Sequence, residues 1–367
     1  MSRPGARVAT VLSAHEPPPP RGTARDGRRP ALRIALFVAG LAVLGALLAT
    51  VGWKSVAANL ALIGGWFAGI VVLYALAQLA FALGWWVLTG PAPRPMSFGA
   101  LFAAYLGGDS INYFTSVGGE PVKAQLLKDE MGFSRALATV AVHRHADVLA
   151  QWLFLTGGVG FALTYFHLPT VARVAALASL LGLGGLVFWM TWGLRRGAFG
   201  PAIAWLGRFR PFRKHTARLQ DAAARLDATI GEFYRQKSGH FGWAIAWCLL
   251  GWCGGLLETY LVLRLLSPSH GWATAIAIES LAMVLNNVLL FIPGRVGSAE
   301  GVRVGVYALL GLTAAQGTAY ALVRRGRELL WLVPGFVVLL RRHVLGVGHM
   351  KLPPIEMQDV GPGEVIR

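Results

Sequence analysis

The chain has 367 residues, of which 55% are apolar and 14% are charged, and its formal net charge is +17. A soluble protein of this length does not bury so many apolar residues, so the sequence predicts a protein that crosses a membrane several times. The basic residues cluster between apolar runs and not on aromatic-bearing basic helices, which favours cytoplasmic loops beside anionic lipid and argues against nucleic acid. Cys248 and Cys253 lie inside one apolar run, so we expect no disulfide framework, metal site or cofactor.

The N-terminal part combines a basic tail with the first two predicted spans. Residues 1–30 are rich in Arg and Pro and carry few large apolar side chains, which predicts a disordered cytoplasmic tail. The first apolar run is long and begins only near residue 31, which favours a retained span over a cleaved signal peptide. Residues 31–53 and 66–90 are each long enough to cross about 30 Å of hydrocarbon.

The first break in an apolar run follows these spans. Residues 97–114 predict an apolar helix, but Gly118 and Gly119 interrupt it before Glu120. The next residues, as far as Glu130, carry too many charges to cross a membrane.

The rest of the chain contains further spans and a second break. A strongly basic segment, residues 194–240, lies between the predicted spans at 171–193 and 241–266 and is expected to be a cytoplasmic loop. The remaining predicted elements are spans at 134–166, 171–193, 241–266 and 318–340, helices at 273–292 and 301–312 on either side of a second break, and a short cytoplasmic tail at 343–367.

Charge distribution decides the path of the first break but not that of the second. If residues 97–116 crossed the membrane alone, every later loop would change sides and the basic segment would lie outside. A re-entrant hairpin keeps all the basic regions in the cytoplasm. At the second break, a hairpin and a pair of full spans both leave the C-terminus inside. The prediction is therefore an all-α polytopic membrane domain, residues 31–342, of about six full spans plus two re-entrant or broken hairpins related as an inverted repeat.

The two breaks share a pattern of Asn, an apolar stretch, a Gly-rich loop and a Glu that begins a new helix. The first runs from Asn112 to Pro121 and the second from Asn287 to Glu300. Non-helical backbone at membrane depth is tolerated only inside protein or beside a wet cavity, and paired broken helices indicate a substrate site near the midplane. Helix N-termini that follow glycines offer N–H groups to an anion such as a lipid phosphate. Two simpler interpretations stay open: each break is only a kink, or each Glu only satisfies its own helix end.

Charged residues inside other apolar runs are further candidates. Arg144 and Asp147 lie three residues apart on one helix face and can form either an interfacial salt bridge or a lipid contact. Arg324 and Arg325 fall inside the last predicted span, where charges usually face a cavity or a partner. Glu258 is a single acid within a span and is weak evidence for proton coupling. The predicted head-group ligands are Asn112, Gly118, Gly119, Glu120, Lys123, Arg144, Asp147, Asn287, Pro293, Gly294, Arg295, Gly297, Glu300, Arg324 and Arg325.

At these motifs the chain resembles the lysylphosphatidylglycerol synthase transmembrane region, a flippase-like family of bacterial inner-membrane proteins. The resemblance rests on residues 112–123, 142–147, 291–300 and 321–325 and covers residues 31–342. It implies a lipid-flipping domain in the inner membrane. Bifunctional members carry an aminoacyl transferase after the membrane part, whereas this chain stops soon after its last span, so the resemblance does not imply synthase activity here. Arg295, where many relatives have a small residue, and Val117, where a Pro-Gly pair is expected, depart from the family pattern.

Three functions remain after the motif search. Nucleophile elbows, paired metal-ligand motifs and P-loops are absent from the sequence, so we expect a non-enzymatic protein. The leading hypothesis is a translocase for anionic or aminoacylated phospholipid, with a hopanoid cargo also open because some relatives accompany hopanoid synthesis genes. The alternatives are a scaffold that recruits a lipid-synthesis enzyme through the basic segment and an intramembrane lipid-modifying enzyme. The expected partners are membrane lipids, with a lipid-synthesis enzyme or a second copy of the chain as further possibilities.

Overall fold

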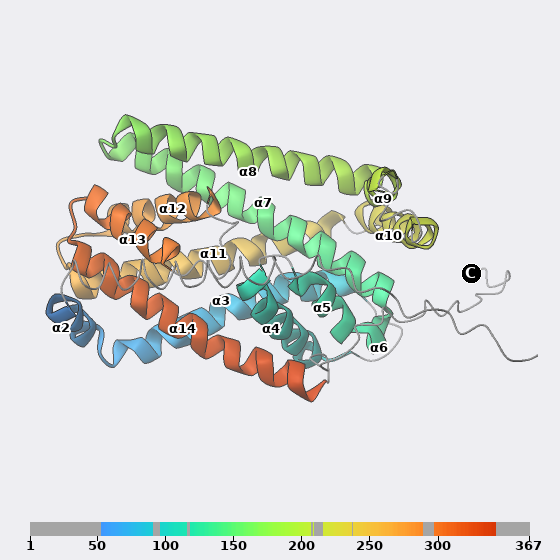
Figure 1. The fold of residues 1–367 in the computed structure, drawn as a ribbon, viewed down its shortest axis with the longest axis horizontal. Helices are drawn as coiled ribbons and strands as arrows, with labels where there is room; N and C mark the ends of the chain where they lie inside the picture. Colours follow the sequence, from blue (N-terminus) through green and yellow to red (C-terminus); the bar gives the residue numbers. More distant parts are fainter. Residues whose placement is uncertain are drawn as a thin grey trace, which may run out of the picture.

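The computed structural model describes residues 53–90, 96–115, 118–206, 208, 216–236, 238–288 and 297–342, and all regular elements in these ranges are helices (Figure 1). Both predicted tails and nearly all of the predicted span at 31–53 lie outside the described residues. The helices are α2 (Trp53–Ile63), α3 (Trp66–Thr89), α4 (Phe98–Thr115), α5 (Gly119–Leu126), α6 (Lys128–Met131), α7 (Phe133–Tyr165), α8 (Thr170–Arg196), α9 (Phe199–Leu206), α10 (Thr216–Gln236), α11 (Ser238–Leu266), α12 (Trp272–Val288), α13 (Ser298–Leu309) and α14 (Ala314–Arg341).

Four of the described helices are long and apolar enough to cross a membrane: α3, α7, α8 and most of α11. The predicted polytopic helical class is therefore confirmed. The last predicted span, α14, has 28 residues and thus the necessary length, but charged side chains interrupt its apolar sequence. Helix α8 has the smallest buried share of the four, and Val171, Leu181 and Phe188 on it are highly exposed. Such an apolar surface fits contact with lipid chains.

The described helices on either side of each break are short. Helix α4 has 18 residues and α5 has 8, while α12 has 17 and α13 has 12. At 1.5 Å per residue, even α4 reaches only about 27 Å, less than the hydrocarbon thickness of about 30 Å. The first pair therefore fits a re-entrant hairpin, whereas the path of the second break stays open, because residues 289–296 lie outside the described residues. The α4–α5 and α12–α13 hairpins lie toward opposite ends of the molecule in Figure 1.

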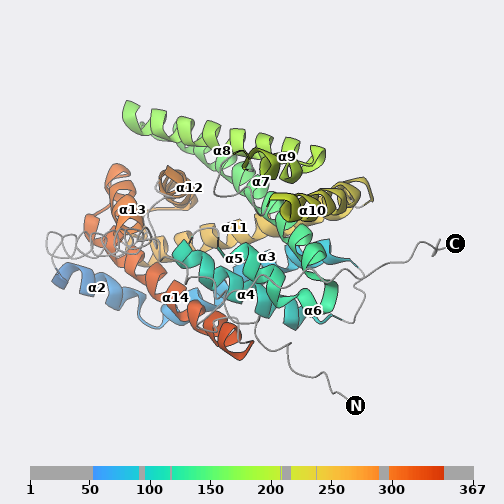
Figure 2. The ribbon, with the colours of Figure 1, turned by 45° about the vertical axis from the view of Figure 1, so that its right-hand side comes forward.

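Each half of the chain packs its hairpin against a long helix of the other half. Helices α3 and α11 run side by side through the centre of the molecule (Figures 1 and 2). Helix α4, from the first hairpin, packs against α14, and α12, from the second hairpin, packs against α7. Each hairpin thus contacts the long helix that follows the other hairpin. This reciprocal packing agrees with the predicted inverted repeat.

The basic segment contains ordered helices where the sequence predicts a loop. Helix α8 continues to Arg196 and ends at Gly197, whose φ of 76° is left-handed. The amides of Phe199 and Gly200 then donate to the carboxylate of Asp227 at 3.2 and 2.8 Å, so the start of α9 is tied to α10. Helix α10 also packs on α7 and α8. The sequence predicts a loop here because the net apolar content of this charged, amphipathic helix is low.

Candidate functional site

The first break is closed by the side chain of Asn112. Its amide oxygen accepts a hydrogen bond from the backbone N–H of Gly119 at 2.7 Å, and its amide nitrogen donates to Glu120 Oε1 at 3.0 Å. Gly119 is buried against α4, and a Cβ at this position would collide with the carbonyl of Gly108. The second glycine of the break therefore allows α5 to approach α4 closely. Pro121 lies in the first turn of α5, where its missing N–H costs no helical hydrogen bond.

A group of charged residues surrounds this hairpin. Arg144 Nη1 and Asp147 Oδ2 form the predicted ion pair at 2.9 Å on α7, and the Arg144 side chain is 45% exposed. Lys123 on α5 is buried, and its ammonium lies 4.6 Å from the centre of the Tyr105 ring. The second carboxylate oxygen of Glu120, Oε2, is buried and has no hydrogen-bond partner among the described residues.

At the second break, Gly297 and not Ser298 occupies the N-cap of α13. Gly297 has a φ of 78°, a left-handed value that favours glycine, and Ser298 is the first helical residue. The chain therefore enters α13 through a left-handed turn. Glu300, only 3% exposed, binds Arg325 Nη2 at 2.7 Å on another helix. Pro293, Gly294 and Arg295 lie outside the described residues, and Asn287 is half-buried in the last turn of α12.

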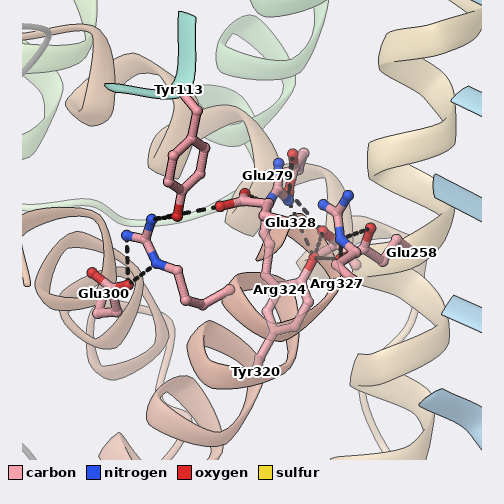
Figure 3. Close-up of polar contacts among 10 residues, drawn as sticks. Tyr113, Glu258, Glu279, Glu300, Tyr320, Arg324, Arg327 and Glu328 are labelled. Carbon is pink, nitrogen blue, oxygen red and sulfur yellow. Dashed lines mark hydrogen bonds and ion pairs between the residues drawn. The ribbon is translucent and has the colours of Figure 1, made fainter. Parts of the chain in front are cut away.

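Arg325 on α14 connects the residues beside both breaks. Its guanidinium donates to Glu300 at the start of α13 and to the hydroxyl of Tyr113 in the last turn of α4 (Figure 3). Glu328, one turn further along α14, adds a longer contact to Arg325 at 3.7 Å. The sequence predicted that both hairpins face one site, and the structure brings one residue from each of them to a single cation.

Arg324, the neighbouring cation on α14, forms a second branch of the network. It donates to both carboxylate oxygens of Glu279 on α12 at 3.0 and 3.1 Å. Thr259 on α11 donates to the same carboxylate at 2.6 Å and also shares a hydrogen bond of 2.7 Å with the Tyr320 hydroxyl. Helices α11, α12 and α14 are thus joined by polar contacts that lie inside the protein (Figure 3).

Arg327 forms the most deeply buried branch. It contacts Glu258 Oε2 on α11 at 2.8 Å, and both side chains are 2% exposed or less. The guanidinium also lies 3.8 Å from the centre of the Tyr74 ring on α3. A charged pair at this depth persists only when both charges are matched and hydrogen-bonded. Glu258, which the sequence presented as an isolated acid, is therefore a partner in an ion pair.

The whole cluster is balanced in charge but not completely satisfied. Its ionised residues are Glu258, Glu279, Glu300, Glu328, Arg303, Arg324, Arg325 and Arg327. Among the described residues, Glu300 Oε2, Arg303 Nε and Arg327 Nη1 are buried without a hydrogen-bond partner. An unmatched buried polar atom costs about 1–3 kcal/mol, so these atoms are the places where a ligand or water gains most.

A small cavity adjoins the cluster between α3, α4 and α14. Its volume is about 20 Å³, and its polar lining includes Tyr74, Gln78, Asp109, Tyr113 and Glu328. This volume holds about one water molecule, far less than a lipid head group. The arrangement described here is therefore closed at this point. Within the described ranges, no group of three His, Cys, Asp or Glu side chains is placed to hold a metal ion.

The sequence identified part of this cluster and missed the rest. It singled out Arg324, Arg325 and Glu300, but not Glu279, Tyr320, Tyr113 or Arg303 as ligands or partners. Glu279 had a usable signal, because an acid inside an apolar run is a functional candidate by default. The tyrosines had none, since a tyrosine in a membrane helix is common and its partners lie on distant segments.

The fold and the cluster define a polytopic helical membrane protein with two hairpins and a charged network within its helical bundle. A family model described as the lysylphosphatidylglycerol synthase TM region matches residues 31–335, and the chain belongs to this family. That membership associates it with lipid handling in a membrane. No curated protein and no solved structure gives a significant match to the chain.

Proposed function

We propose that this protein is a lipid translocase that binds a phospholipid head group between its two hairpins. The observation that carries the proposal is Arg325, whose guanidinium contacts Tyr113 beside the first break and Glu300 beside the second. A cation held at this depth by residues from both halves is costly unless it is used. Membership of a family of lipid-handling membrane proteins supports a lipid as the ligand.

The proposed transport step separates the two hairpins. Helices α5 and α13 begin beside the breaks, so the positive ends of their dipoles and the nearby Lys123 and Arg303 attract a phosphate. The reciprocal packing of α4 on α14 and of α12 on α7 lets one half rock against the other around this region. The head group would travel through the protein while the acyl chains stay in lipid.

The proposal includes a cargo class, a location and an orientation. The cargo is an anionic or aminoacylated phospholipid, with a hopanoid as the less direct candidate, and no catalytic step is assigned. The location is a bacterial inner membrane. The basic α9–α10 region and both termini are assigned to the cytoplasm, because basic segments are retained on that side.

Reconstitution tests this function directly. The full chain is placed in liposomes that contain fluorescent phosphatidylglycerol, lysyl-phosphatidylglycerol or phosphatidylethanolamine, and transbilayer transfer is measured. Arg325→Ala is expected to slow transfer by about tenfold or more, because it removes the contact between the hairpins. The matched control is Arg342→Ala at the end of the same helix, where the side chain is 50% exposed; its transfer rate is expected to equal that of the wild type. No transfer by the folded wild-type protein with any of the lipids refutes the proposal.

A scaffold is the second candidate, and the order of the α9–α10 region favours it. This region is folded onto α7 and α8 and exposes basic side chains, as a docking surface for a lipid-synthesis enzyme requires. The triple variant Glu120→Gln, Glu300→Gln and Arg325→Gln separates the two functions. A scaffold keeps its cellular lipid phenotype in this variant, whereas a translocase loses it.

A further inference from the structure

The residues around the two hairpins repeat each other at the level of sequence. Near its start, α5 reads Glu120-Pro-Val-Lys123, and α13 reads Glu300-Gly-Val-Arg303 near its start. The long helices that follow show the same relationship: residues 142–147 read Val-His-Arg-His-Ala-Asp, and residues 323–328 read Val-Arg-Arg-Gly-Arg-Glu. The spacing from residue 120 to 144 is nearly the same as that from residue 300 to 325.

These matches define two sets of four charged residues, each with two acids and two cations. The first quartet is Glu120, Lys123, Arg144 and Asp147, and the second quartet is Glu300, Arg303, Arg325 and Glu328. Lys123 and Arg303, which correspond to each other in the two quartets, have closely similar surroundings. Lys123 and Arg303 are each 6% exposed, and they lie 4.6 and 5.0 Å from the centres of the Tyr105 and Tyr320 rings.

The quartets differ in how their arginines are paired. In the second quartet, Arg325 reaches across to Glu300 at 2.7 Å, and the arginine side chain is 15% exposed. In the first quartet, Arg144 instead pairs with Asp147 on its own helix and is 45% exposed. Glu120, the counterpart of Glu300, accepts its hydrogen bond from Asn112. The equivalent Glu and Arg are therefore ion-paired in the second quartet, whereas no ion pair joins Glu120 and Arg144 among the described residues.

We propose that the two quartets are equivalent head-group sites that open alternately. In the opposite state, Arg144 pairs with Glu120, while the pair between Arg325 and Glu300 is broken and the second quartet becomes exposed. This inference rests on the proposed function for the nature of the ligand. It assigns Arg303 and Glu328 the same roles as their counterparts Lys123 and Asp147. The unmatched Glu300 Oε2 and Arg303 Nε are then atoms that gain partners when the second quartet binds a head group.

The test follows the exposure of both hairpins at once. Val122→Cys and Val302→Cys, at corresponding positions of the two motifs, serve as reporters in a background with Cys248→Ala and Cys253→Ala. The full chain is reconstituted in liposomes, and each reporter is labelled with a water-soluble maleimide from either side. Arg325→Gln removes the pair that holds the present state, and Arg144→Gln removes the pair of the proposed opposite state.

Alternation predicts changes of opposite sign at the two reporters. With Arg325→Gln, labelling at the position-302 reporter is expected to rise by about tenfold and labelling at the position-122 reporter to fall, as loss of one ion pair shifts a two-state equilibrium. Arg144→Gln is expected to produce the reverse pattern. Glu300→Gln should reproduce Arg325→Gln, and Arg325→Lys, which keeps the charge, should shift the equilibrium less.

The labelling result is independent of transport. If Arg325→Gln or Glu300→Gln changes only the position-302 reporter, or moves both reporters in one direction, the alternation proposal is wrong even where lipid transfer occurs. If the reporters move oppositely and no lipid is transferred, the alternation stands and the proposed function fails. A monodisperse elution profile in detergent identifies the folded variants to which these comparisons apply.

Discussion

At the scale of single residues, the structure turns isolated intramembrane charges into pairs. Glu258 and Glu279 stand alone within apolar runs of the sequence, yet each lies within 3.1 Å of an arginine from α14. The pairing matters because an ionised group inside a protein that crosses lipid loses its hydration and needs an opposite charge to replace it. Replacing one member should therefore cost more than replacing both.

The Arg327–Glu258 pair provides a prediction at this scale. Arg327→Met is expected to lower the free energy of unfolding by about 3–5 kcal/mol, because it leaves the Glu258 carboxylate buried without its cation. The measurement is thermal unfolding of the purified protein in detergent. Adding Glu258→Gln to Arg327→Met should recover most of the loss. Equal melting temperatures for the wild type and the single variant would show that the pair does not stabilise the fold.

At the scale of elements, the hairpins depend on close approach of backbones. Gly119 meets the Gly108 carbonyl of α4, and Gly335 of α14 meets Ser110 and the Leu106 carbonyl of the same helix. Glycines at these points let α4 pack between α5 and α14. Small residues at helix contacts are the usual means of bringing membrane helices close together. The hairpin position is therefore sensitive to a single added methyl group.

Gly119→Ala tests this dependence. Because the new Cβ collides with a backbone carbonyl, which cannot move aside as a side chain does, the variant is expected to lose about 1–3 kcal/mol of stability. Gly182→Ala on α8 is the control, since a Cβ there meets open space and alanine favours a helix. Thermal unfolding of both variants gives the comparison. A melting temperature for Gly119→Ala at or above that of Gly182→Ala would contradict the close-packing argument.

At the scale of the whole molecule, the basic residues should fix the orientation in the membrane. The short connection between α11 and α12 lies at the opposite end of α11 from the α10 end, and Figure 1 shows α9 and α10 together at one end of the molecule. Basic segments remain on the cytoplasmic side during insertion. The α9–α10 region is therefore expected inside and the α11–α12 connection outside.

Cysteine labelling in cells tests this orientation. Ser269→Cys and Arg225→Cys place reporters at exposed positions of the two regions, in the background without Cys248 and Cys253. An impermeant maleimide should label the position-269 reporter in spheroplasts with an intact inner membrane. The position-225 reporter should react only after that membrane is permeabilised. The opposite result would invert the proposed topology.

Much of the fold was predictable because its signals are local in the sequence. The apolar runs gave α3, α7, α8 and α11, and the glycines located the first break within a residue or two. Helix α10 was not predicted, because its many charged residues made this part of the basic segment resemble a loop. The charge distribution did not decide the path of the second break, because a hairpin and a pair of full spans both leave the following segments on the same side of the membrane. The residues of the second break, 289–296, lie outside the described part of the chain, so its path stays a prediction.

The sequence alone determined the two breaks. It predicts two helices that are interrupted at Gly-rich loops, each followed by a Glu, in a chain with too many apolar residues to be soluble. Only the tertiary structure decided which charges meet. Tyr113 and Arg325 are 212 residues apart in the chain, and Glu258 and Arg327 are 69 apart. No local pattern specifies such contacts, because they depend on how the two halves pack and on the need of each buried charge for a partner.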